Sequence, residues 1–181
     1  TGLTNFAHGE MVTFGGLMAF LFNVTMGIPL LISAPIVEDV RLRGDAALKD
    51  YRQRFDFVAC DEPLYLDTVG ELSADLHKAV DQASRNIQSF AEAQLPTSWM
   101  REFSDGRSLG QVIRPLDSVG VYVPAGRYPL ISTLLMAVIP AQVAGVQNIM
   151  VACPRPSLDM LAVAKLLGVR QILHAGGAQA I

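Results

Sequence analysis

Residues 119–152, VGVYVPAGRYPLISTLLMAVIPAQVAGVQNIMVA, decide the fold of this 181-residue chain, because strand and helix patterns alternate within them. The continuous apolar run Val119–Val123 is typical of a buried strand, and Ile131–Gly145 has the spacing of a helix. Ile149–Ala152 is a second apolar run of the same kind. Short apolar strands that alternate with helices of roughly 10–15 residues are typical of β-α-β units with right-handed crossovers. This stretch therefore predicts a parallel sheet.

The same alternation continues to residue 181. Leu158–Leu167 predicts a second helix, Gln171–His174 predicts a third strand, and Gly176–Gln179 predicts a turn that opens a further helix. Because that helix has barely begun at residue 181, we expect an incomplete Rossmann-like parallel sheet with helices, of the α/β class.

A helical region precedes the expected sheet. Pro35–Phe57 has apolar positions at helical spacing, and we expect Gly44 to end a first helix and Asp45 to cap a second. Val69–Gln94 predicts a long helix that Pro96 stops. Two shorter features are a strand candidate at Pro63–Leu66 and a turn bracketed by Gly106 and Gly110, ahead of residues 111–114.

The beginning of the chain has a different composition. Residues 11–33 carry no charged side chain, and an apolar run longer than roughly 18 residues predicts a membrane-spanning helix. Gly27 and Pro29 are expected to break or kink this hydrophobic helix. We therefore expect three parts: a hydrophobic segment (1–33), a helical region (34–110) and the Rossmann-like part (111–181). Membrane association would occur through residues 11–32.

Charge and cysteine content limit the partners of the chain. The net charge is −3, and the basic residues are interspersed with acidic ones, which argues against a nucleic-acid partner. Cys60 and Cys153 are too few and too far apart for a disulfide framework or a zinc cage. Cys153 ends an apolar run, so we expect a buried free thiol and a cytoplasmic location.

Two glycine-containing turns follow strands at the edge where parallel sheets bind ligands. One turn follows Tyr122 and contains Arg127, and the other is Gly176–Gln179. Backbone amides at such turns, with the next helix N-terminus, favour phosphate. By residue type, Tyr122 is a half-buried aromatic, Gln179 bonds local amides, and Arg127 receives a phosphate or forms a surface ion pair. These turns predict a crevice large enough for a nucleotide, although neither has the G-x-G-x-x-G pattern of a dinucleotide site. They contain no residues that indicate a chemical reaction.

No residue pattern predicts a metal site or a catalytic nucleophile. His8, His77 and His174 stand alone, without an H-x-x-x-H, H-E-x-x-H or C-x-x-C arrangement. We expect His77 on the surface of the long helix, and His174 in the core or at the rim of the sheet. We therefore assign no catalytic and no metal-binding residue in this chain.

Several blocks of the sequence closely resemble histidinol dehydrogenases, in the order that this family has. These blocks are Asp39–Asp45, Arg54–Asp56, Asn86–Gln94, Ile113–Leu130, Ser132–Met136, Pro140–Gly145 and Gly176–Ile181. The resemblance spans about residues 34–181. It implies a zinc-dependent, homodimeric, cytoplasmic enzyme of histidine biosynthesis, which oxidises L-histidinol to L-histidine with two NAD molecules.

The resemblance also implies roles for individual residues. Tyr122 and Gln179 match family residues that contact NAD, and we expect them at the tips of neighbouring parallel strands. The zinc ligands, the substrate-binding serine and the Glu-His acid/base pair of the family all follow the Gly176–Gln179 block. The resemblance therefore implies a truncated enzyme that is catalytically incomplete and inactive alone.

Two departures from the family leave alternatives open. Ala125 stands where the family usually has glycine, which would suit a related NAD-dependent alcohol dehydrogenase of the same family. Residues 2–11, with the hydrophobic run after them, resemble a branched-chain amino-acid ABC transporter permease. A transporter fragment is therefore the second alternative, although one span cannot build a substrate site in the membrane.

Overall fold

The computed structural model describes residues 30–56, 58, 59, 61–124 and 128–180, which form two compact units. Unit 1 contains the described residues up to Leu64 and the segment from Ala175 onward, and unit 2 is Tyr65–His174. The expected hydrophobic helix at residues 11–32 lies almost entirely outside the described residues. Within the described part of the chain, no helix is both long and apolar enough to cross a membrane. The predicted domain boundaries at residues 33 and 110 stay predictions.

Unit 1 is built from short helical elements. Helix α2 (Leu30–Arg43) and helix α3 (Asp45–Tyr51) are followed by the π-helical turn η1 (Arg52–Asp56). The 3-10 turn η2 (Ala178–Ala180) packs against both α2 and α3. This arrangement brings the two ends of the described chain into one unit.

Gly44 separates α2 from α3, as the sequence predicted. Its φ of +57° lies in the left-handed region, which glycine adopts without the steric cost of a Cβ. The prediction that Asp45 caps α3 is wrong by one position, because Gly44 occupies the cap and Asp45 is the first helical residue. There its carboxylate lies in the first turn, where negative charge favours the helix dipole.

Unit 2 contains the predicted parallel sheet. Its strands are β4 (Ser118–Tyr122), β5 (Asn148–Ala152) and β6 (Gln171–Leu173), which pair in parallel in the order β6-β5-β4. Strand β1 (Tyr65–Asp67) adds to β6 in antiparallel orientation. The expectation that Tyr122 and Gln179 follow neighbouring strands is wrong, because β5 lies between β4 and β6.

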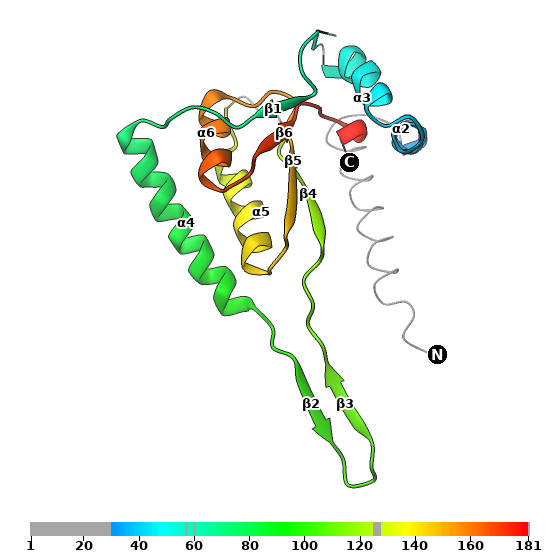
Figure 1. Cartoon of the computed structure of the whole chain (residues 1–181), viewed down its shortest axis with the longest axis vertical. Helices are drawn as coiled ribbons and strands as arrows, with labels where there is room; N and C mark the ends of the chain where they lie inside the picture. Colours follow the sequence, from blue (N-terminus) through cyan, green and yellow to red (C-terminus); the bar gives the residue numbers. More distant parts are fainter. Residues whose placement is uncertain (1–29, 57, 60, 125–127, 181) are drawn as a thin grey trace. The chain divides into compact units, whose positions relative to one another are not determined.

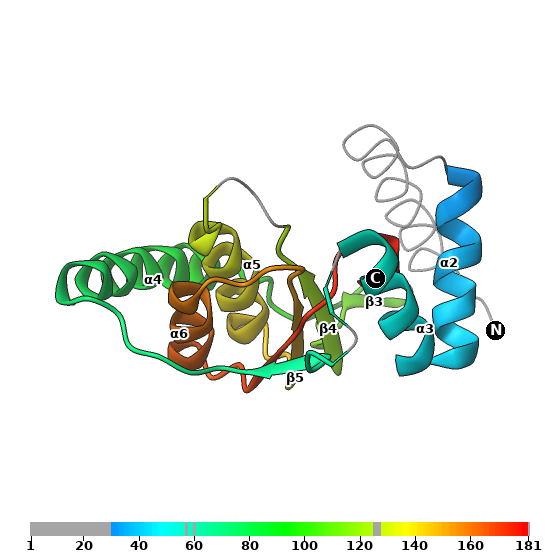
Figure 2. The same ribbon diagram turned by 90° about the horizontal axis from the view of Figure 1, so that it is seen from above.

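Three helices complete unit 2: α4 (Ala74–Gln94), α5 (Ile131–Val143) and α6 (Leu158–Leu166). Helices α5 and α6 lie on the same side of the sheet (Figure 2), and α4 packs against α5. Helix α4 begins five residues later than predicted, because Gly70 has a φ of +100° and Ser73 forms the N-cap. It ends before Pro96, as predicted, with Leu95 in an extended conformation.

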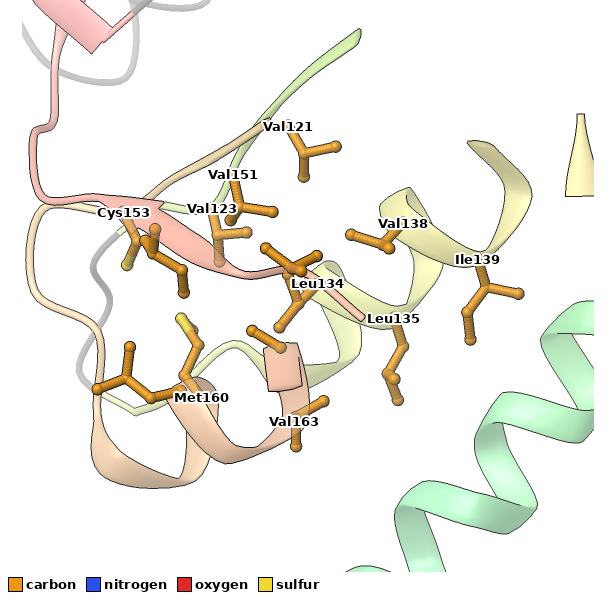
Figure 3. Packing of buried hydrophobic residues seen from close by; sticks show 14 of the residues in the cluster. Val121, Val123, Leu134, Leu135, Val138, Ile139, Val151, Cys153, Met160 and Val163 are labelled. Carbon is orange, nitrogen blue, oxygen red and sulfur yellow. The ribbon is translucent and has the colours of Figure 1, made fainter. Parts of the chain in front are cut away.

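The core of unit 2 lies between the sheet and these helices (Figure 3). Val121 and Val151 of the strands point toward Leu134 of α5, which has no exposed surface. Cys153 is 1% exposed and free, which confirms the predicted buried thiol. The labelled core residues are Val121, Val123, Leu134, Leu135, Val138, Ile139, Val151, Cys153, Met160 and Val163.

A β-hairpin in unit 2 was not predicted. Strands β2 (Trp99–Glu102) and β3 (Ser108–Gln111) pair in antiparallel orientation and extend away from the rest of unit 2 (Figure 1). Only the turn around Gly106, with a φ of +82°, was expected. Every residue of both strands is exposed, so the hairpin lacks the alternating apolar pattern by which a strand is recognised.

Candidate functional site

Tyr122 lies at the carboxyl end of β4, in unit 2. Its backbone pairs with Ala152 of β5, and the next residue continues the ladder, with the Val123 amide 2.9 Å from the Ala152 oxygen. Alternation along the strand places Tyr122 on the opposite face from the buried Val121 and Val123. The ring is half-buried, which confirms the burial predicted from residue type. Arg127 and Ala125, on the following turn, lie outside the described residues.

The N-terminus of α5 offers backbone amides to an anion. The cap residue Leu130 makes no side-chain hydrogen bond to the first turn, and that turn contains no acidic residue. Amides at a helix start that no side chain caps are suited to phosphate oxygens, and the helix dipole adds to the attraction. The start of α5 is therefore the place at this edge of unit 2 where an anion would meet backbone amides that no side chain caps.

Gln179 belongs to η2 in unit 1 and is buried, with 2% of its surface exposed. Its Nε2 lies 3.3 Å from Oδ2 of Asp56, which also accepts the backbone amide of Gly176 at 2.9 Å. The sequence predicted local amides as the partners of Gln179, whereas the structure shows a carboxylate that lies 123 positions earlier. Tyr122 belongs to unit 2, and Gln179 belongs to unit 1.

Asp56 and Arg52 were missed as site residues. Asp56 belongs to one of the blocks that carry the family resemblance, but nothing in its local sequence shows that its partners are Gly176 and Gln179. Arg52 is 1% exposed and donates from Nη1 to the Pro63 oxygen at 2.7 Å and from Nη2 to the Glu62 oxygen at 2.6 Å. Arg52 therefore ties η1 to the segment before β1.

An ion-pair network stabilises the charged face of α2. Arg43 donates to both carboxylate oxygens of Asp39, at 2.7 and 2.6 Å, and Tyr51 donates to Oδ2 at 2.8 Å. The hydrogen bonds from Arg43, and then from Tyr51, lower the pKa of Asp39 to about 2. The same contact with Asp39 raises the pKa of Tyr51.

The remaining titratable candidates lie where the sequence placed them. His77 is exposed on α4, with Nδ1 3.3 Å from Asp81, and His174 is buried with 7% exposure. Burial raises the pKa of the Cys153 thiol, so this group is held as the unreactive thiol form.

Zinc does not fit the described residues. In that part of the chain, no three His, Cys, Asp or Glu side chains come close enough to hold a metal ion. A catalytic zinc needs about three protein ligands. We therefore assign no zinc ligand here and derive no reaction step through this metal.

A hollow of about 780 Å³ lies at the opposite edge of the sheet. Its lining includes Ser118 and Asn148, which begin β4 and β5, and Arg170, which precedes β6. Parallel sheets bind ligands at the carboxyl ends of their strands, whereas this hollow borders the amino ends. The edge with Tyr122 and the start of α5 is therefore the stronger candidate.

Comparisons with known proteins agree on one family. The family model described as histidinol dehydrogenase matches residues 32–181. The histidinol dehydrogenase of Geobacillus kaustophilus is 43% identical over 157 residues, and that of Bacillus subtilis is 41% identical over 157 residues. Each match covers 81% of this chain, and 37% and 36% of the two relatives.

A solved structure gives the same result. The crystal structure of histidinol dehydrogenase from Elizabethkingia anophelis superposes with a TM-score of 0.71 at 31% identity. It covers 82% of this chain and 37% of that protein. The chain thus spans a little over one third of the length of the relatives it matches.

Proposed function

Because the chain belongs to the histidinol dehydrogenase family, we propose that it forms the NAD-side portion of an enzyme that oxidises L-histidinol to L-histidine. The family match over residues 32–181 carries this proposal. The parallel sheet supports it, because β4 and the helix after it form a strand-turn-helix unit of the type that holds nucleotides.

The residues of this chain would bind and orient NAD. When bound, NAD supplies the carbon that accepts a hydride from the alcohol substrate. The first amides of α5 would hold a phosphate, and the half-buried ring of Tyr122 would contact the dinucleotide at the end of β4. Gln179 would contact NAD from η2, through the amide that Asp56 holds.

We further propose that this chain does not turn over histidinol by itself. The described residues contain no group able to hold zinc, and the chain spans only 37% of the length of its Geobacillus relative. Purified chain supplied with histidinol, NAD and zinc ions should therefore produce no NADH by absorbance. A full-length relative serves as the positive control, and sustained NADH production by the chain alone would overturn this part of the proposal.

Homodimerisation and a cytoplasmic location are proposed on the same family ground. Sedimentation of the chain would test dimerisation, and fractionation of cells that express the chain with or without residues 1–33 would test its location.

Neither the structure nor the comparisons support the transporter alternative. A related alcohol dehydrogenase of the same family remains a second candidate, favoured by Ala125, and a panel of alcohol substrates on the full-length enzyme would distinguish the two.

A further inference from the structure

Asp56 connects two segments of unit 1 that are distant in sequence. It ends the π-helical turn η1, and its Oδ2 accepts hydrogen bonds from the Gly176 amide at 2.9 Å and from Gln179 Nε2 at 3.3 Å. A π-helical turn is rare and often marks a functional position. The Asp56 carboxylate therefore accepts two hydrogen bonds from the glycine turn that the sequence indicated as a ligand site.

The first consequence concerns charge. Backbone amides of a glycine turn attract anions, but the Gly176 amide already donates to a carboxylate. A phosphate brought to this amide would displace Asp56 or lie beside its negative charge, and like charges at such distances repel. The Gly176 amide is therefore not available to phosphate, unlike the uncapped amides at the start of α5.

The second consequence concerns the direction of the Gln179 amide. An ionised carboxylate only accepts hydrogen bonds, so the nitrogen of the amide must face Asp56 and its oxygen must face away. With 2% of its surface exposed, the side chain can offer a ligand little more than one atom. Because Nε2 faces Asp56, this atom is the amide oxygen, which accepts hydrogen bonds.

Gly177 leaves space for the same amide, because it has no side chain. A Cβ at this position would lie 2.9 Å from Gln179 Oε1 and 3.3 Å from Nε2, closer than side chains pack. The backbone φ of +65° also favours glycine. The Gln179 amide therefore occupies space beside Gly177 that any larger residue would fill, with the Asp56 carboxylate as its hydrogen-bond partner.

We propose that Asp56 is a positioning residue, which turns Gln179 so that its amide oxygen accepts a hydrogen bond from an uncharged donor of NAD, such as a ribose hydroxyl or the carboxamide nitrogen. The inference rests on the proposed contact between Gln179 and NAD. It assigns the phosphates of NAD elsewhere and makes Asp56 a determinant of which part of the dinucleotide meets this turn.

A double-mutant cycle tests the inference. Asp56→Ala removes Oδ2, the oxygen that accepts from both Gly176 and Gln179, so the Gln179 amide is no longer held in one direction. We expect the Kd for NAD to weaken on the order of tenfold in Asp56→Ala, the size of one lost hydrogen bond. In a Gln179→Ala background, the same change should have no further effect, because the residue through which Asp56 acts is gone.

The cycle also separates positioning from a merely structural role. A structural role would act through Gly176 and weaken NAD binding equally with and without Gln179, whereas a positioning role acts only where Gln179 is present. Asp50→Ala, which removes an exposed carboxylate from α3, is the matched control and should bind like wild type.

Each outcome separates the two proposals. If wild type shows no NAD binding, the proposed function and this inference both fail. If wild type binds NAD but Asp56→Ala weakens binding equally in both backgrounds, only the positioning role is overturned. The ¹⁵N amide signal of Gly176 should not move with inorganic pyrophosphate, and a saturable shift would refute the exclusion of phosphate. If Asp56→Ala does not fold, Gln179→Ala alone replaces it, and NAD binding equal to wild type would then overturn the role.

Discussion

Single side chains of unit 1 connect separate segments of the chain. Asp56 reaches the Gly176–Gln179 turn, and Arg52 ties η1 to the carbonyl oxygens of Glu62 and Pro63. The partial burial of Tyr122 could be predicted, because it depends on residue type and position in a strand. The role of Asp56 could not, because it depends on a contact across more than a hundred residues.

Cys153 provides a test of burial at the residue scale. Its thiol is 1% exposed, and burial raises its pKa, so the reactive thiolate is scarce in the folded protein. Iodoacetamide should leave the peptide containing Cys153 unmodified in native protein and label it after denaturation. Mass spectrometry follows each cysteine separately, and rapid labelling of Cys153 in the native state would contradict the packing of this core.

Asp39 provides a test of pH dependence. Its folded pKa of about 2 lies below the ordinary value of 3.8, so the ionised form is favoured by folding. The stabilisation is complete above the ordinary value and is lost as the pH falls through about 2. Thermal unfolding of wild type and Asp39→Asn should differ near neutral pH and converge toward pH 2. A difference that stays constant down to about pH 2 would exclude this network as the cause.

At the scale of elements, the sequence predicted the β-α-β alternation closely. Helices α5 and α6 and strands β4, β5 and β6 lie within one or two residues of their expected bounds. Their apolar runs are continuous because each element contributes to the core. The β2–β3 hairpin was missed because its side chains are exposed on both faces, so burial left no pattern in its sequence.

The N-cap of α6 is open to a direct test. Ser157 Oγ accepts the amide of Met160 at 3.2 Å, at the start of a helix in which residues 160–164 are buried. Ser157→Ala should lower the free energy of unfolding by about 1 kcal/mol, because an orphan amide loses its acceptor. Ser84→Ala, inside α4, is the control and should stay within about 0.5 kcal/mol of wild type. Equal stability of Ser157→Ala and wild type in urea unfolding would show that the cap contributes nothing.

At the scale of the whole molecule, both crossover helices of unit 2 cover the same face of the sheet. They do so because the chain moves in one direction from β4 through β5 to β6. The continuous apolar runs predicted buried strands, but Ser118 and Gly120 of β4 and Asn148 and Met150 of β5 are exposed. Patterning alone could not show which face the helices cover.

We propose that Tyr122, at the carboxyl end of β4, and Gln179, in η2, each contact NAD. NMR titration of the ¹⁵N-labelled chain with NAD tests it most directly. We predict weak, saturable shifts of the amides around Tyr122, in the first turn of α5 and in Gly176–Gln179. The absence of saturable shifts, or shifts confined to the opposite edge around Ser118, Asn148 and Arg170, would contradict the account.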